Sequence, residues 1–408
     1  MTFRFLILLC FAAITTALTA QTLQSHQTEI LNKPTVAWKF KTKAPIFGSP
    51  VASKDAVFVG GLDSVMYALQ LATGKLLWTF KTGGEIRSTV CLSDTDLFFY
   101  SGDATMYCLD KSTGMLKWKF RTKGGLLGDR RHDFADYFQS SPVLKDDRLF
   151  FGGGDGRLYA LAVADGSLLW VFKTNGIIHT TPALDETRVY AGSFDGHLYA
   201  LDQRDGRLCW KFKTVGHVYF PDGEVQGSPV VANGTVYAGA RDYNLYAIDA
   251  AEGYCRWNKK FPSGWALALT PNDSVIYVGT SDDRVLAALD SNTGLEIWRS
   301  DVKFNIFGPC SFTASMAYVG TLMGKVFGID LRDGKIKWSL TTDSHSAQRR
   351  KYFLADDVFR DDIIKIIKTP VDFIAMEYAL GAIFSTPAIA DNRLIVSSTD
   401  GTLYCFQE

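Results

Sequence analysis

The sequence predicts an all-β protein, an eight-bladed β-propeller whose four-stranded antiparallel blades form one closed ring. A tryptophan recurs at intervals close to 40 residues, a period typical of repeats of about four short strands. Each interval contains the same order of short apolar runs, and incomplete units at the two ends of the chain complement each other. The tryptophans of the series are Trp38, Trp78, Trp118, Trp170, Trp210, Trp257, Trp298 and Trp338.

The unit that ends at Trp78 illustrates the four predicted strands, which we call A to D. It runs through Gly48-Ser49-Pro50 and then through residues 57–60, 66–69 and 73–78. The apolar runs are rich in β-branched and aromatic residues and are bounded by Gly, Asp or Pro. This pattern is typical of short strands joined by tight turns.

The turns of the repeat also have a recognisable chemistry. Asp155-Gly156, Asp195-Gly196 and Asp400-Gly401 fall between strands B and C, where Asp-Gly tolerates the positive φ angles of a two-residue hairpin. In the turn between strands C and D, a glycine precedes the tryptophan by four residues in every complete unit. We therefore expect each tryptophan to fill an equivalent slot between neighbouring blades.

The two ends of the chain predict how the ring closes. Trp38 is preceded by only one strand, at 37–42, whereas the chain after Trp338 ends in strands A to C, at 385–387, 394–396 and 402–406. We expect the N-terminal strand to pair with these three and complete the eighth blade, which leaves only short outer edges exposed.

The first twenty residues are typical of a secretory signal peptide. Arg4 precedes an apolar run over 5–14, and Leu18-Thr19-Ala20 ends in a small residue. We therefore expect an exported protein, periplasmic or extracellular and with outer-membrane association left open, whose residues 21–408 form a single propeller without a transmembrane segment. The 43 basic and 43 acidic residues balance, which disfavours a nucleic-acid partner.

Six cysteines follow the signal segment, and all of them fall on predicted strands. Structural disulfides are possible in an exported protein, but the favoured interpretation is that these residues are buried free thiols that act as small hydrophobic side chains. No CxxC pattern occurs among them. The six are Cys91, Cys108, Cys209, Cys255, Cys310 and Cys405.

Tyr199-Ala-Leu-Asp202, Asp205-Gly206 and Trp210 resemble the tryptophan-docking repeat of the PQQ-type β-propellers, and the unit around Trp118 matches it too. This superfamily includes quinoprotein alcohol dehydrogenases and the outer-membrane assembly factor BamB, and the resemblance covers nearly all of the chain after the signal segment. For the dehydrogenases it implies calcium ligands, a catalytic Asp and commonly a vicinal cysteine pair, and no Cys-Cys occurs here.

Function is expected where the repeat is interrupted. Three connections from strand D to the next strand A are long, at 123–138, 215–225 and 343–382, and we expect them to rim one mouth of the central channel. Apolar residues within Lys351–Lys368 roughly follow helical spacing before Pro370, which predicts a helix. It would pack over the mouth or rim or, alternatively, be presented to a partner or act as a lid. The candidate partner-binding residues are Arg130, Arg131, His132, Tyr219, Phe220, Phe353 and Phe359.

The start of strand A supplies a second set of candidates, one residue from each blade. Their mixture of aromatic rings with Arg, His and Gln fits a small-molecule pocket at the channel mouth, and the alternative is that they only fill the channel. These predicted ligand-binding residues are Phe47, Arg87, Gln139, His179, Gln226, Trp265, Phe307 and Phe384.

Neither a nucleophile motif nor a strong metal-ligand spacing is visible, so a binding protein is favoured over an enzyme and no catalytic residue, metal or cofactor is predicted. The leading hypothesis is an exported, non-catalytic scaffold similar to BamB that binds a protein or peptide partner of the cell envelope through its insertion-bearing face. The alternatives are an oxidoreductase that uses PQQ with calcium, or a small-molecule or carbohydrate binder, at the channel mouth.

Overall fold

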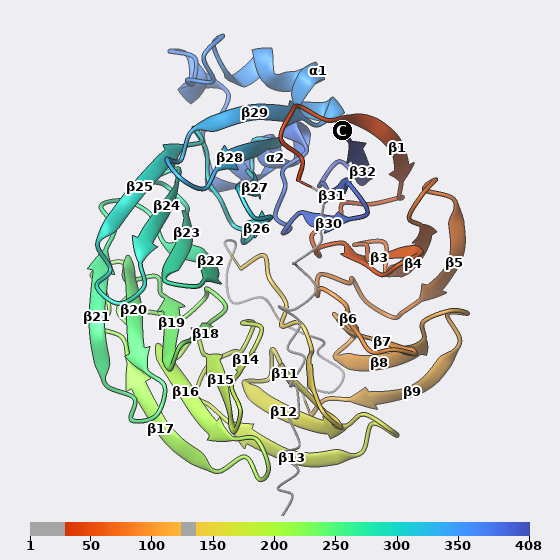
Figure 1. Ribbon diagram of the computed structural model, residues 1–408, viewed down its shortest axis with the longest axis vertical. Coiled ribbons are helices and arrows are strands. Elements are labelled where there is room, and N and C mark those ends of the chain that lie inside the picture. The colour runs from red at the N-terminus through yellow and green to blue at the C-terminus, as the bar shows by residue number, and fades with distance from the viewer. Residues whose placement is uncertain (1–28, 124–135) are drawn as a thin grey trace, which may run out of the picture.

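The computed structural model describes residues 29–123 and 136–408 and confirms the eight-bladed propeller. Eight four-stranded antiparallel sheets surround a central axis, with strand A innermost and strand D on the perimeter (Figure 1). We number the blades in chain order from the first complete unit. The predicted signal segment, residues 1–20, lies outside the described residues.

Blades 1 to 4 each contain four strands that are consecutive in the chain. Blade 1 contains β2 (Val51–Ala52), β3 (Ala56–Gly60), β4 (Val65–Gln70) and β5 (Leu76–Lys81). Blade 2 contains β6 (Cys91–Leu92), β7 (Asp96–Ser101), β8 (Thr105–Asp110) and β9 (Leu116–Arg121). Blade 3 contains β10 (Val143–Lys145), β11 (Arg148–Gly152), β12 (Arg157–Ala162) and β13 (Leu168–Lys173). Blade 4 contains β14 (Ala183–Leu184), β15 (Arg188–Gly192), β16 (His197–Asp202) and β17 (Leu208–Lys213).

Blades 5 to 7 follow the same order, and blade 8 is shared between the two ends of the chain. Blade 5 contains β18 (Val230–Ala232), β19 (Thr235–Gly239), β20 (Asn244–Asp249) and β21 (Cys255–Lys260). Blade 6 contains β22 (Ala266–Asn272), β23 (Val275–Thr280), β24 (Val285–Asp290) and β25 (Glu296–Asp301). Blade 7 contains β26 (Ser311–Phe312), β27 (Met316–Gly320), β28 (Lys325–Asp330) and β29 (Ile336–Thr341). Blade 8 contains β30 (Ala388–Ala390), β31 (Arg393–Ser397), β32 (Thr402–Gln407) and β1 (Thr35–Lys41).

The hydrophobic core lies between adjacent sheets. Strands B and C are buried on both faces, so Phe58 and Met66 of blade 1 pack in one cluster with Leu97 and Phe99 of blade 2. Strand D alternates between exposed and partly buried residues because its outer edge faces solvent. Burial on both faces explains why strands B and C read as short continuous apolar runs.

Each tryptophan of the series docks on the following blade. The Trp38 indole Nε1 donates to the Leu71 carbonyl at 2.9 Å, and the bonds of the next six tryptophans measure 2.8 to 3.2 Å. The ring lies against the glycine of the C–D turn, since a Cβ on Gly74, whose φ is 70°, would be 2.6 Å from the Trp38 ring. The predicted slot is confirmed, and the turn glycine is needed both for its backbone angle and for its lack of a side chain.

Ring closure follows the predicted scheme, with β1 antiparallel to β32. Blade 8 has no C–D turn, so Trp338 docks instead on the segment before β1, where its Nε1 donates to the Ile30 carbonyl at 3.3 Å. The Glu408 carboxylate accepts hydrogen bonds from the Leu31 amide at 2.8 Å and from the Asn32 side chain at 2.6 Å. These contacts replace the missing turn at the eighth junction.

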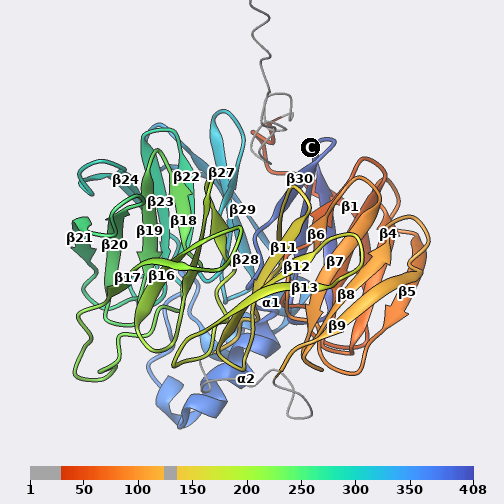
Figure 2. The same cartoon turned by 90° about the horizontal axis from the view of Figure 1, so that it is seen from below.

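The two faces of the ring carry different connections. We call the face with the B–C turns and D–A connections the insertion face, and the face with the A–B and C–D turns the terminal face. Figure 2 shows α1 (Asp343–Tyr352) and α2 (Pro370–Leu380) below the ring on the insertion face, while β32 ends on the opposite side. The D–A connections therefore share one face, as predicted from the meander topology.

The third insertion forms two helices, but not where the apolar spacing predicts one. The predicted helix over Lys351–Lys368 is wrong: α1 ends at Tyr352, the chain turns at Asp357 with a φ of 65°, and only the short helix η3 (Ile363–Lys365) follows. Pro370 begins α2 because the Thr369 hydroxyl accepts from the Asp372 amide in a capping box. A proline at the first helical position loses no hydrogen bond there, so it starts a helix as readily as it ends one.

Candidate functional site

Five aromatic rings fill the centre of the insertion face. Phe47 and Phe384 stack with their centroids 4.6 Å apart, and the Tyr137 ring lies 4.7 Å from Phe384. Phe307 and Tyr378 meet this pair edge-on. We call these five residues the aromatic plug. Tyr137 comes from the first insertion and Tyr378 from α2, so two interruptions of the repeat converge with the starts of three inner strands.

The eight residues predicted to ring the channel fall into three groups. The three phenylalanines belong to the aromatic plug. Arg87, Gln139 and His179 border a cavity inside the channel, and Gln226 and Trp265 surround a buried arginine. The eight residues lie at the same position along the channel axis but do not form one common pocket. That they bind a ligand stays a prediction.

A buried histidine–aspartate contact fastens the end of the first insertion to blade 4. His179 Nδ1 lies 2.8 Å and 3.0 Å from the two carboxylate oxygens of Asp136, and both side chains are at most 1% exposed. Nearby, the Arg87 guanidinium pairs with Glu85, and the Arg87 amide donates to the Gln139 side chain at 3.3 Å. These polar groups border the plug on the side of blades 2 to 4.

A buried arginine organises the side of blade 5. Arg241 is 1% exposed, and its Nε donates to the Gln226 side-chain oxygen at 2.7 Å. Its guanidinium carbon lies 5.0 Å from the Trp265 ring, 5.2 Å from Phe194 and 5.7 Å from Phe220, within the range of cation–π attraction. The arginine therefore fixes the base of the second insertion.

A buried carboxyl group lies beside the plug on α2. Glu377 is 1% exposed, and the Tyr137 hydroxyl donates to its Oε2 at 3.4 Å. Burial raises the pKa of Glu377 to about 8, and the negative charge of Asp282 contributes in the same direction. At neutral pH this side chain is therefore largely protonated and can itself donate a hydrogen bond.

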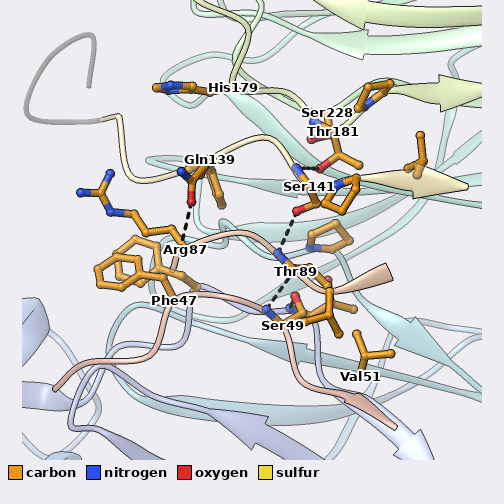
Figure 3. Close-up of a pocket in the computed structure, with 18 of the residues that line it drawn as sticks. Phe47, Ser49, Val51, Arg87, Thr89, Gln139, Ser141, His179, Thr181 and Ser228 are labelled. Atoms are coloured by element: carbon orange, nitrogen blue, oxygen red, sulfur yellow. Dashed lines mark hydrogen bonds between the residues drawn. The ribbon is translucent and has the colours of Figure 1, made fainter. Parts of the chain in front are cut away.

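A cavity of about 630 Å³ occupies the channel beyond the plug, towards the terminal face (Figure 3). Its wall is formed by the inner strands, which present apolar side chains such as Val51, Val143 and Val230 and a proline from each of six blades. The prolines are Pro50, Pro142, Pro182, Pro229, Pro309 and Pro387.

A belt of hydroxyl groups connects the blades around this cavity. Within it, a backbone N–H donates to the hydroxyl oxygen of the next blade, as from Ser49 to Thr89 at 3.1 Å and from Thr89 to Ser141 at 2.9 Å (Figure 3). Equivalent bonds follow to blade 5 and from blade 8 to blade 1. The hydroxyl belt consists of Thr386, Ser49, Thr89, Ser141, Thr181 and Ser228. Blades 6 and 7 place Leu267 and Pro309 at this position.

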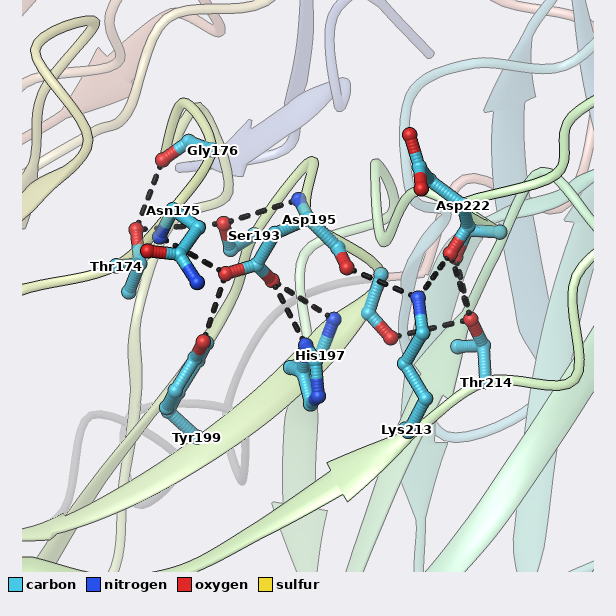
Figure 4. Close-up of polar contacts among 12 residues, drawn as sticks. Thr174, Asn175, Gly176, Ser193, Asp195, His197, Tyr199, Lys213, Thr214 and Asp222 are labelled. Atoms are coloured by element: carbon cyan, nitrogen blue, oxygen red, sulfur yellow. Dashed lines mark hydrogen bonds and ion pairs between the residues drawn. The ribbon is translucent and has the colours of Figure 1, made fainter.

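A second cavity of about 640 Å³ opens between blades 3 and 4 on the insertion face. Its polar groups are held by the repeat itself: Lys213 Nζ donates to the Asp195 carbonyl at 2.9 Å, and the Tyr199 hydroxyl donates to the Asp195 carboxylate at 2.7 Å (Figure 4). The same tyrosine–aspartate bond recurs in five other blades. These groups therefore stabilise the B–C turns and carry no evident chemistry.

Of the predicted partner-binding residues, Arg130, Arg131 and His132 lie outside the described residues, as does most of the 123–138 insertion. Tyr219 is 76% exposed at the tip of the second insertion. Other large apolar side chains are also exposed on the second and third insertions. We call this group the apolar rim, and it consists of Val215, Val218, Tyr219, Ile364 and Val371.

The remaining predicted rim residues point inward. Phe220 packs edge-on against Trp265 at 5.1 Å, and Phe353 stacks on Phe359 at 4.8 Å with Phe353 only 3% exposed. In this conformation Phe353 is not accessible to a partner. These residues support the insertions, and a direct role in binding stays a prediction.

The sequence analysis missed Arg241 and Glu377, although each leaves a signal. Arg241 occupies the position before the turn Asp, where other blades have residues as different as Leu62 and Phe194. A position that varies between the units of a repeat is not required by the fold and is therefore available for function. Glu377 is a carboxylate inside the apolar run of 373–380. An ionisable residue in such a run is a candidate for a buried functional group.

Potential metal ligands are scattered across the described residues, and the cysteines are separate free thiols. Across residues 29–123 and 136–408, no group of three or more His, Cys, Asp or Glu side chains could hold a metal ion. The six cysteines are free; Cys310 lies just before β26 and not on a strand, and Cys255 is exposed, contrary to the expectation of burial. Burial raises the pKa of Cys310 to about 11, so its thiol is protonated at neutral pH.

No helix in the described part of the chain combines the length and the apolar character that crossing a membrane requires.

Comparison with known proteins bears on the family. The family model described as outer membrane protein assembly factor BamB matches residues 29–133, 130–220 and 214–365. Among curated proteins, no match was found. The fold resembles BamB from Moraxella catarrhalis, with a TM-score of 0.68, 16% identity and coverage of 92% of this chain and all of that one.

Two dehydrogenase structures are equally similar in fold. A quinohemoprotein alcohol dehydrogenase from Pseudomonas putida HK5 has a TM-score of 0.68 at 11% identity, covering 92% of this chain and 76% of that one. A europium-containing methanol dehydrogenase has a TM-score of 0.68 at 13% identity, covering 94% and 95%. At such identities these structures support the fold alone, whereas the family model spans most of the sequence. The chain therefore belongs to the family of the outer membrane protein assembly factor BamB.

Proposed function

We propose that this protein is an exported, non-catalytic scaffold of the cell envelope that binds a protein or peptide partner through its insertion face. The observation that carries the proposal is the apolar rim, a set of exposed large side chains on the two described insertions. Family membership supports an envelope location and a role in outer-membrane assembly.

The second insertion has the features of an interaction site. Tyr219 and Val218 are 76% and 79% exposed, yet the adjacent Phe220 is held by Trp265 and Arg241. An exposed tyrosine on a fixed base loses little conformational freedom on binding, and tyrosine is enriched at protein interfaces. This arrangement favours docking of a partner at the tip.

The third insertion is also held in place. The Asp357 carboxylate pairs with Lys325 of β28 and with Arg349 of α1, at 2.9 Å for the arginine. These two cations hold the pKa of Asp357 below its ordinary value, although burial acts in the opposite direction. Because Lys325 belongs to the blade itself, the insertion is anchored to the propeller and presents Ile364 and Val371 outward.

The aromatic plug argues against the alternative of a quinone with calcium at this mouth. A planar cofactor needs a flat slot, and the stacked rings of Phe47, Phe384 and Tyr137 already fill the centre of the insertion face. Among the described residues, the carboxylates at this mouth do not gather into a cation site. The described residues at this mouth thus do not fit the cofactor.

Photo-crosslinking at matched tyrosines tests the proposal. A photoreactive phenylalanine analogue would replace Tyr219 on the apolar rim and, as the control, Tyr254, which is 58% exposed at the C–D turn of blade 5 on the terminal face. After irradiation in envelope preparations, we expect a discrete adduct from position 219 and none from position 254. Mass spectrometry of the adduct would identify the partner.

A charge substitution provides the second arm. The double variant Val218→Asp/Ile364→Asp should lower recovery of the crosslinked partner at least tenfold, because burying two carboxylates in an apolar contact is unfavourable. Leu295→Asp, at a 70% exposed residue of the outer edge, is the matched control and should leave recovery unchanged. Equal adducts from positions 219 and 254, or full recovery with the double variant, would refute the proposal.

A further inference from the structure

The channel cavity has an electrostatic character that the proposed scaffold role does not use. Of the described residues that line it, none is an Asp or Glu, whereas Arg87 and His179 lie at its inner end. The Arg87 side chain is 17% exposed and borders this cavity as well as the plug. Arg87 is paired with Glu85 and His179 lies against Asp136, but neither carboxylate lines the cavity, so the polar groups that face a ligand there are mainly hydrogen-bond donors.

The hydroxyl belt supplies donors to the same space. Each hydrogen bond found for its hydroxyls among the described residues uses the oxygen as the acceptor from a backbone N–H. The hydroxyl hydrogens therefore remain available, and all six residues line the cavity and are only partly buried. A ring of such donors suits a ligand group with several acceptor oxygens.

The outer part of the cavity is apolar. In five of the six inner strands that carry a belt hydroxyl, a proline follows it and then a residue such as Val51 or Val143, whereas in blade 2 Val90 follows Thr89. The cavity thus changes along the axis from Arg87 and Gln139, through the hydroxyl belt, to an apolar collar near the terminal face. Its volume of about 630 Å³ lies within the range of small-molecule sites, which is about 300–1,000 Å³.

We infer that this cavity binds an apolar carboxylate, such as a straight-chain fatty acid. The carboxylate lies against the hydroxyl belt and Arg87, and the hydrocarbon chain lies within the proline and valine collar. The site is reached from the terminal face, so it is separate from the partner-binding apolar rim and does not depend on it.

Calorimetric titration with a homologous series tests the inference. Hexanoate, octanoate, decanoate and dodecanoate would be compared with octanol and octylamine at low ionic strength. We expect saturable binding of the carboxylates with an optimum length, at least tenfold weaker binding of octanol, and none of octylamine. A short apolar peptide with a free C-terminus, and its amide as control, would show whether a peptide terminus is an alternative source of the carboxylate.

Variants locate the binding. Arg87→Gln should weaken octanoate binding at least tenfold without affecting octanol, whereas Arg204→Gln, at an 80% exposed side chain of an outer turn, is the control. Val143→Phe and Ala183→Phe, from two different blades, fill the cavity and should each abolish binding of both probes. Circular dichroism and thermal unfolding would confirm that each variant is folded.

The inference is overturned if no carboxylate binds the folded wild-type protein saturably, or if octylamine binds as well as octanoate. It is also overturned if octanoate binding survives in both cavity-filling variants. Two filling variants are used so that failure of one of them to fold leaves the other to decide.

Discussion

The two mouths of the channel are built from the two ends of the same inner strands, yet they differ in almost every property. At the insertion face, the aromatic plug seals the axis and encloses the buried Glu377. Towards the terminal face, hydroxyls and prolines that recur from blade to blade line an accessible cavity. The lining towards the terminal face thus comes from residues of the repeat, whereas the plug at the insertion face depends on residues from interruptions of the repeat.

This difference shows that the channel is closed at one end, by the aromatic plug, and has its cavity towards the other end. The insertions supply Tyr137 and Tyr378 to the plug, so the segments proposed to carry the partner are also those that complete the core at that end. A substitution at the insertion face should therefore affect stability and binding together, whereas the open mouth should tolerate change with little loss of stability.

The largest expected effect is on the plug. Phe384→Ala removes a ring that is 2% exposed and packed against three other aromatic rings, so we expect a loss of about 3–5 kcal/mol in the free energy of unfolding. Phe312→Ala, at a half-buried phenylalanine near the terminal face, should cost clearly less. Urea denaturation measures both, and equal losses would erase the contrast between the mouths.

The next effect is a pH dependence that only the sealed mouth should have. Because the pKa of Glu377 in the folded protein, about 8, lies above its ordinary value of 4.5, the folded protein keeps a proton that the unfolded chain has lost. This contribution therefore lowers stability as the pH rises from about 4.5 to about 8, by at most about 1.4 kcal/mol per pH unit, and levels off above.

Glu377→Gln removes this ionisation and should flatten the corresponding part of the profile of unfolding free energy against pH. Glu186→Gln, at an 80% exposed side chain near the terminal face, should leave the profile unchanged. A profile for Glu377→Gln with the same decline as the wild type would assign the pH dependence to other groups.

The smallest effect is expected at the hydroxyl belt. Thr89→Val leaves the Ser49 amide without its acceptor and should cost about 1–3 kcal/mol in unfolding free energy, while Thr89→Ser keeps the oxygen and should cost less. Chemical denaturation of the pair measures the contribution of the bond. A loss with Thr89→Val as large as that of Phe384→Ala would mean that the open mouth is as important for stability as the plug.

The fold was predictable because the same sequence signals recur in every repeat unit. Eight tryptophans, seven turn glycines and two complementary chain ends each point to the same ring, and the structure confirms their packing. The position of the eight channel residues along the channel axis was predictable for the same reason. Residues that align within the repeat lie at the same distance along the axis in every blade.

It was not predictable that these residues would divide among the aromatic plug, the cavity wall and the surroundings of Arg241. This division depends on Tyr137 and Tyr378, which come from insertions without a counterpart in other blades. The predicted helix position in the third insertion was also wrong. The helices begin where Thr342 and Thr369 cap them, whereas the apolar spacing arises from an irregular segment that packs on the plug.

The eighth blade, which is shared between the two ends of the chain, makes circular permutation of this protein feasible. Thr35 lies opposite Gln407, so the first and last strands of the ring lie side by side. Joining the ends with a linker and opening the chain at another C–D turn would produce a circular permutant with every sheet retained, provided that residues 30–32 still dock on Trp338. Any domain fused to the C-terminus of the natural chain would also leave from the terminal face, pointing away from the apolar rim.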